Sequence, residues 1–181
     1  VWLHRLLLTM IVATGVAFVT MVSLAYSVDT IVTWSLPTVP ISLWLNALVG
    51  GPLLAAITLY AAQWRALAGR FGLLLMTVPF IALAANMAAY IVQGRLLNGV
   101  ANSVVAAADL VPHYRTMLLV FALMCFAGCV LAAFTMHAVS REAVAHGGGE
   151  LAFSKRVLVR LLVSCLLVFA GIFVMRFAFY M

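Results

Sequence analysis

The chain has 181 residues, of which 67% are hydrophobic and 8% are charged, and its mean hydropathy is +1.25. A soluble domain cannot bury that much apolar surface, so the composition excludes a soluble globular protein and predicts an integral membrane protein. The net charge of +6 does not indicate nucleic-acid binding, because cations at helix ends are what membrane topology requires.

Five apolar stretches, in chain order, are each long enough to cross a bilayer. A hydrocarbon core of ~30 Å needs about 20 helical residues at ~1.5 Å rise each. The predicted spans are 6–28, 41–62, 71–92, 117–136 and 157–180. The sequence therefore predicts an all-α fold, a polytopic transmembrane helix bundle of about five spans that forms a single domain over residues 1–181. The connections at 93–115 and 137–156 are expected to be loops.

The connection between the third and fourth spans has a character of its own. Residues 96–111 are rich in alanine and valine, carry a few polar side chains, and lead to Pro112. Such a run is too short and too polar to span. It predicts an interfacial helix on the membrane surface.

Positive charge predicts the topology. If the spans alternate, one side holds Arg5, Arg65, Arg70, Arg141, Lys155, Arg156 and Arg160, and the other holds Arg95, Arg115 and Arg176. The positive-inside rule makes the side with seven cations cytoplasmic. We therefore expect the amino end inside and the carboxyl end outside.

The few polar residues within the spans do not form a pattern that predicts a cofactor, metal or ion site. No two histidines lie in mid-span, so we expect no b-type haem, and the three cysteines are too few for an iron–sulfur cluster. We expect those cysteines to pack as small residues and predict no metal site. Asn46 and Asn86 are expected to join helices by hydrogen bonds. The absence of buried charge argues against an ion-coupled pump or channel.

What remains is a membrane anchor that binds a lipophilic molecule at an interface. A quinol needs an apolar slot, hydrogen-bonding groups for its two oxygens, and proton acceptors near water. The outer edge offers six candidates: Asp29, Trp34, His113, Arg115, Arg176 and Tyr180. Two structural alternatives stay open: Arg176 extends its side chain to the interface, and the aromatic residues form the aromatic belt at headgroup level.

Two stretches resemble the dimethyl sulfoxide reductase anchor subunit family. The first covers residues 27–54, with WSLPTVPISL from Trp34 onward and Gly50-Gly51 after it; the second is the closing GIFVMRFAFY, which includes Arg176. Family members usually have eight spans, and these five match the last five. The family's His-Leu-Gly loop, associated with menaquinol oxidation, belongs to the front half and has no counterpart here. The chain begins at Val1, which fits a trimmed start, a valine initiator or the back part of a longer protein.

The resemblance implies a function and its partners. The expected function is a membrane anchor subunit of a respiratory molybdoenzyme in a bacterial inner membrane, one that passes electrons from menaquinol to an iron–sulfur subunit. The iron–sulfur clusters and molybdopterin would lie on the iron–sulfur and catalytic partner subunits, with no cofactor on this protein. The alternatives are a small transporter or permease component and a purely structural membrane subunit.

Overall fold

The computed structural model describes residues 2–26, 33–34, 36–101, 106–145 and 153–177. Its helices are α1 (Trp2–Ala25), α2 (Thr38–Ala61), α3 (Arg70–Leu96), α4 (Tyr114–Ala145) and α5 (Lys155–Phe177), with short 3₁₀ turns at Arg65–Ala68 and Leu97–Gly99. All five long helices are apolar and long enough to cross a membrane. The described residues contain no named strand, only an isolated bridge between Ala101 and Ala106. The predicted all-α bundle of about five spans is confirmed.

The helix ends differ from the predicted span ends where the backbone leaves the apolar run. α4 continues past position 136 to Ala145, and α3 continues past position 92 to Leu96. The prediction of loops at 93–115 and 137–156 is therefore wrong at their edges. Hydropathy marks where the bilayer stops, whereas alanine, arginine, glutamate and leucine continue a helix beyond that point.

The predicted interfacial helix between α3 and α4 is not confirmed. The described residues there form the 3₁₀ turn Leu97–Gly99, the bridge of Ala101 with Ala106, and further turns up to His113. Glycine at the start of the connection and proline at its end interrupt helical hydrogen bonding. The described residues of this connection therefore form turns in place of a helix.

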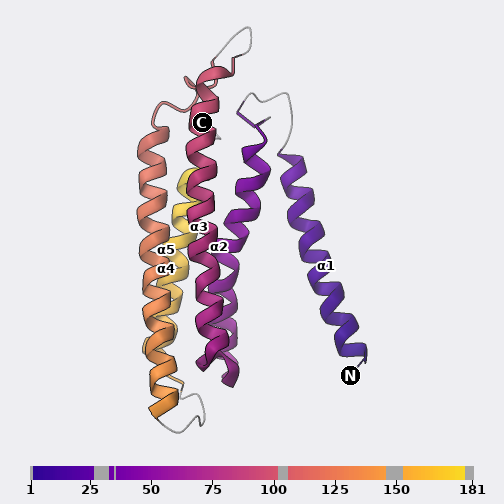
Figure 1. The fold of residues 1–181 in the computed structure, drawn as a ribbon, viewed down its shortest axis with the longest axis vertical. Coiled ribbons are helices and arrows are strands. Elements are labelled where there is room, and N and C mark those ends of the chain that lie inside the picture. Colours follow the sequence, from indigo (N-terminus) through magenta and orange to yellow (C-terminus); the bar gives the residue numbers. More distant parts are fainter. Residues whose placement is uncertain (1, 27–32, 35, 102–105, 146–152, 178–181) are drawn as a thin grey trace.

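Helices α2 to α5 form a four-helix bundle in which each helix packs against two neighbours (Figure 1). α2 lies against α3 and α5, and α4 lies against the same two helices. α1 stands apart and contacts α2. Across Trp2–Ala25, all of which the structure describes, only Ser23 is buried. The core that positions other side chains is therefore that of α2 to α5.

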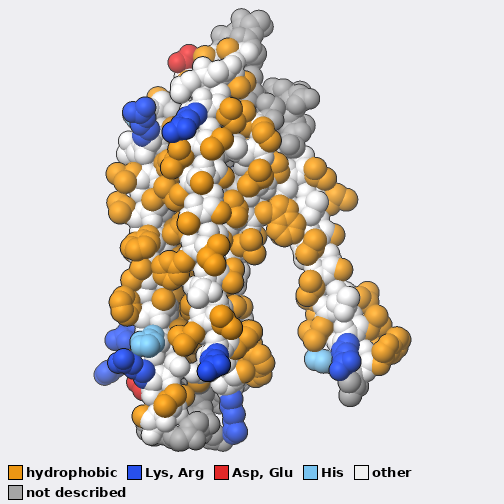
Figure 2. Space-filling model, viewed as in Figure 1, with side chains coloured by type: hydrophobic (Ala, Val, Ile, Leu, Met, Phe, Trp, Pro, Cys, Tyr) orange, Lys and Arg blue, Asp and Glu red, His pale blue; other side chains and the backbone are white. Residues whose placement is uncertain are grey.

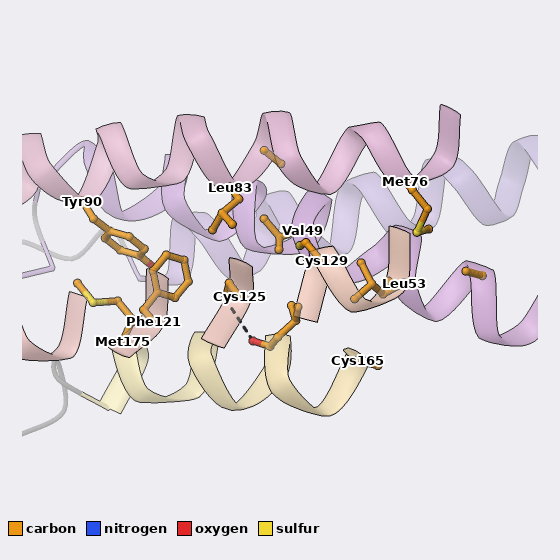
Figure 3. Close-up of a cluster of buried hydrophobic side chains, with 14 of the residues drawn as sticks. Val49, Leu53, Met76, Leu83, Tyr90, Phe121, Cys125, Cys129, Cys165 and Met175 are labelled. Carbon is orange, nitrogen blue, oxygen red and sulfur yellow. Dashed lines mark hydrogen bonds between the residues drawn. The ribbon is translucent and has the colours of Figure 1, made fainter. Parts of the chain in front are cut away.

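Small residues allow the closest helix pair, α4 and α5, to approach. A Cβ atom at Gly128 would lie 2.6 Å from the carbonyl oxygen of Ser164, and one at Gly171 would lie 2.9 Å from Sγ of Cys125. In a membrane, association depends on such packing, because lipid is as apolar as the helix surface. Cys125 and Cys129 of α4 and Cys165 of α5 are buried among the core side chains (Figure 3), as the prediction of packing cysteines requires.

Lys and Arg side chains lie at the two ends of the bundle, separated by an apolar middle (Figure 2). We call the end with Arg95, Arg115 and Arg176 the Arg115 end, because α3 and α5 finish there and α4 begins there. The opposite end, where α4 finishes and α3 and α5 begin, is the Arg141 end. The described cations at the Arg141 end are Arg5, Arg65, Arg70, Arg141, Lys155, Arg156 and Arg160. The ends thus divide the cations as the sequence predicts.

Candidate functional site

A cavity of about 630 Å³ opens at the Arg115 end, between the last turns of α3, the connection after it and the first turns of α4. His113 and Arg115 are exposed on its α4 side, and Arg95 is exposed on its α3 side. The other lining residues are Ile91, Gly94, Leu97, Asn98, Ala108, Val111, Pro112, Tyr114, Thr116 and Leu118. The cavity therefore joins an apolar wall to two guanidinium groups and an imidazole.

Tyr114 fixes the start of α4 against the end of α3. Its ring packs on Gly94, where an added Cβ atom would lie 2.7 Å from ring atom Cε1. Its hydroxyl donates a hydrogen bond of 2.6 Å to the carbonyl oxygen of Tyr90. Because Tyr114 is anchored in this way, the residues on either side of it, His113 and Arg115, are held beside the cavity.

The cavity's charge restricts its chemistry. No aspartate or glutamate is among its lining residues, so the two arginines face no carboxylate from the wall. Guanidinium groups at such a place bind electron-rich oxygens, and the apolar wall accommodates a hydrophobic body. Among the described residues, no group of three His, Cys, Asp or Glu could hold a metal ion. The arrangement suits an amphipathic molecule with acceptor oxygens.

A second polar region lies inside the bundle, between α2 and α3. Asn86 Nδ2 donates to Asn46 Oδ1 at 2.7 Å, and Asn46 Nδ2 donates to Tyr90 Oη at 3.1 Å. Asn46 lies eight residues into α2, about 12 Å from its start and a third of the way along it, so this series of bonds lies well inside the bundle. The prediction that Asn46 and Asn86 join helices is confirmed.

Arg176 connects α5 to the same region. Its Nη2 donates to Oγ of the fully buried Ser42 at 3.1 Å, and Ser42 Oγ donates in turn to the carbonyl oxygen of Val39 at 2.8 Å. Arg176 is half-buried. The side chain thus reaches inward to α2, which differs from the simple snorkelling that its place in the last turn of a span allows.

Four buried side-chain atoms have no hydrogen-bond partner among the described residues: Thr38 Oγ1, Asn86 Oδ1, and both Gln93 Nε2 and Gln93 Oε1. All belong to the halves of α2 and α3 nearer the Arg115 end. A buried polar group left unpaired costs about 1–3 kcal/mol, and bilayer hydrocarbon offers it no partner. A bound water or a ligand oxygen near these atoms would supply the hydrogen bonds that they lack.

The structure separates the six predicted site residues. His113 and Arg115 share the cavity, and Arg176 lies at the same end but bonds to Ser42 and does not line it. The Trp34 ring packs on Tyr26 with centroids 4.9 Å apart, beside the end of α1. Asp29 and Tyr180 lie outside the described residues.

Sequence reasoning missed Arg95 as a cavity residue and Gln93 as a buried polar group. The signal for Gln93 was present, because Asn86, Tyr90 and Gln93 follow one another at spacings of four and three, which places them on one face of a helix. Arg95 gave no such signal, since only the fold of the connection after α3 places it beside His113.

Comparisons with known proteins identify the family of this protein. The family model of the DMSO reductase anchor subunit (DmsC) matches residues 1–181. The protein is 33% identical over 120 residues to YnfH, an anaerobic dimethyl sulfoxide reductase subunit of Escherichia coli (strain K12), in an alignment that covers 64% of this sequence and 39% of that relative. It is 35% identical over 114 residues to the C subunit of anaerobic dimethyl sulfoxide reductase from the same organism, covering 62% and 38%. The matched segments thus span about two-fifths of these relatives, and no solved structure matches. This protein, an integral membrane protein, belongs to the DMSO reductase anchor subunit family.

Proposed function

We propose that this protein is part of the membrane anchor of a respiratory molybdoenzyme of the dimethyl sulfoxide reductase type, and that it binds menaquinol at the Arg115 end. The observation that carries the proposal is the cavity, in which His113, Arg115 and Arg95 meet an apolar wall. Family membership favours an anchor over a small transporter or permease component. The iron–sulfur and molybdopterin catalytic subunits are its proposed partners and hold the cofactors.

The chemistry assigned to the cavity is the binding and two-electron oxidation of a quinol. The quinol loses two electrons and two protons and becomes a quinone; the electrons pass to the iron–sulfur subunit and the protons to water. A guanidinium of Arg115 or Arg95 stabilises the anionic quinol oxygen that forms when the first proton leaves. The imidazole of His113, exposed at the cavity rim, accepts that proton and passes it to solvent.

The topology follows from the charges. In a bacterial inner membrane the positive-inside rule places the Arg141 end in the cytoplasm and the cavity on the outer side. The amino end is then inside and the carboxyl end outside.

The test is quinol-analogue turnover in membranes that contain the whole complex, with subunit amounts measured in parallel. We expect Arg115→Gln and His113→Leu each to lower kcat/KM by tenfold or more, about 1.4 kcal/mol of transition-state stabilisation. Arg156→Gln, which removes an exposed cation at the opposite end, is the matched control and keeps full turnover. Unchanged turnover in both cavity variants, with normal assembly, would refute the cavity as the quinol site.

The proposal also keeps four quinol contacts outside the cavity lining: Arg176, Trp34, Asp29 and Tyr180. Arg176→Leu slows turnover without loss of assembly if its guanidinium serves the quinol. Arg176→Lys then restores part of the rate if charge alone matters, and little if the planar fork is needed. Lost assembly would instead assign Arg176 to the bond with Ser42 that joins α5 to α2.

A further inference from the structure

A second cavity, of about 410 Å³, lies between α3 and α4 toward the Arg141 end, far from the proposed quinol site. It is lined by Leu73, Met76, Thr77, Phe80, Val130, Ala133, Phe134 and His137. We call it the α3–α4 groove. Leu74 and Phe134 beside it are 64% and 71% exposed, so the groove lies on the surface that faces lipid.

The two walls of the groove are regular helix faces. Leu73, Met76, Thr77 and Phe80 follow one another at helical spacing on α3, and Val130, Phe134 and His137 do the same on α4. The Thr77 hydroxyl donates to the carbonyl oxygen of Leu74 at 2.7 Å, so it adds little polarity to the wall. Phe80 meets Phe126 with ring centroids 6.3 Å apart, near the middle of the bundle. From Leu73 to Phe80 the apolar wall runs for about 10 Å.

Cations continue both walls where the apolar lining stops. On α4 the stripe through Phe134 and His137 reaches exposed Arg141, four residues after the histidine. On α3 exposed Arg70 precedes Leu73 by three residues. Residues three and four apart share a helix face, so Arg70 and Arg141 continue the two helix faces that line the groove, next to His137 in its wall. Glu142 follows Arg141 but projects about 100° further around α4, away from this stripe.

We propose that the α3–α4 groove binds an anionic phospholipid of the leaflet at the Arg141 end. One acyl chain lies along the apolar walls, and the phosphate is held by Arg70 and Arg141 with His137 at the rim. Arginine binds phosphate through paired N–H groups, and basic pockets between membrane helices select anionic headgroups. An apolar wall only about 10 Å long fits part of an acyl chain better than another transmembrane helix, which needs the full ~30 Å.

The test uses the full-length protein purified in detergent, with phosphatidylglycerol and phosphatidylcholine of matched acyl length as the probes. Native mass spectrometry counts bound lipid, and thermal unfolding measures stabilisation. We expect at least tenfold preference for phosphatidylglycerol, reduced to near equality in the Arg70→Gln/Arg141→Gln double variant and weakened by salt. Arg160→Gln removes an exposed cation at the same end from α5, a helix that contributes no residue to the groove wall, and it keeps the preference.

A second variant tests the groove and not only the charge. Ala133→Leu fills the wall, so we expect it to lower binding of both lipids while circular dichroism stays helical. Equal binding of the two lipids by the unaltered protein overturns the proposal, as does an equal loss in Arg160→Gln and the double variant. Quinone bound in the groove in place of lipid would also overturn it.

Discussion

The close packing of α4 on α5 yields a prediction whose sign depends on the tertiary structure. Gly128 and Gly51 both lie inside long apolar helices, so alanine should favour the helix at each by up to about 1 kcal/mol. Their surroundings differ. A Cβ atom at Gly51 meets nothing within 4 Å, whereas one at Gly128 lies 2.6 Å from Ser164 O and 2.8 Å from Val168 Cγ2.

The steric cost at Gly128 is large because the nearer atom is backbone and cannot rotate away. Overpacking of this kind costs about 1–3 kcal/mol. Pro52 follows Gly51 and disfavours a helical backbone at a residue that carries a Cβ, so part of the propensity gain at Gly51 is lost, and Gly128→Ala should be less stable than Gly51→Ala by the remainder, up to about 3 kcal/mol. For a protein of this size each kcal/mol corresponds to about 2–4 °C, which gives a Tm difference of up to about 12 °C. Gly171→Ala, which meets the more adjustable Sγ of Cys125, should fall between the two.

The assay is thermal unfolding in detergent, followed with a dye that fluoresces when it reacts with a thiol. Cys125, Cys129 and Cys165 are all buried, so dye reaction reports loss of the packed bundle. The expected order of Tm is Gly51→Ala above Gly171→Ala above Gly128→Ala. If Gly128→Ala melts above the unaltered protein, the close approach of α4 and α5 is wrong.

Four further outcomes are expected. A reporter fused after Gly148 should give a cytoplasmic signal, and one fused after Asn98 an outer-side signal; the opposite pair of signals would contradict the proposed topology. Asn86→Leu should cost about 1–3 kcal/mol because it leaves Asn46 Oδ1 unpaired, and the double variant with Asn46→Leu should cost less than the sum of the singles in a double-mutant cycle. Folded protein in membranes should resist a permeant maleimide at all three cysteines, and rapid labelling contradicts their burial. The purified protein should show no b-type haem band after reduction, since no two histidines lie in mid-span; such a band, lost on changing His137 or His4, would falsify that expectation.

The sequence alone was enough to predict the five helices of the described residues that are long and apolar enough to cross a membrane, because the bilayer acts on each segment separately. About 20 apolar residues are enough to insert a helix whatever its neighbours are. The same logic explains the error at the end of α4, which continues from position 136 to Ala145 as a helix beyond the hydrocarbon. The interhelical role of Asn46 and Asn86 was also readable, since a polar side chain in hydrocarbon needs a partner.

Which side chains contact one another depends on how the helices pack. Lipid-facing and core-facing sides of these helices are equally apolar, so hydropathy does not tell one face from the other. Small residues determine which faces pack together. Gly128 leaves room for α5 to approach α4, and Gly94 leaves room for the Tyr114 ring. The sequence predicted that the polar residues of one membrane side form a single cluster. In the structure, Arg115 and His113 line the cavity together with Arg95. Arg176 instead donates a hydrogen bond to Ser42, 134 residues away in sequence. A charge pattern restricts a residue to one membrane surface, and the contacts within that surface depend on how the helices pack.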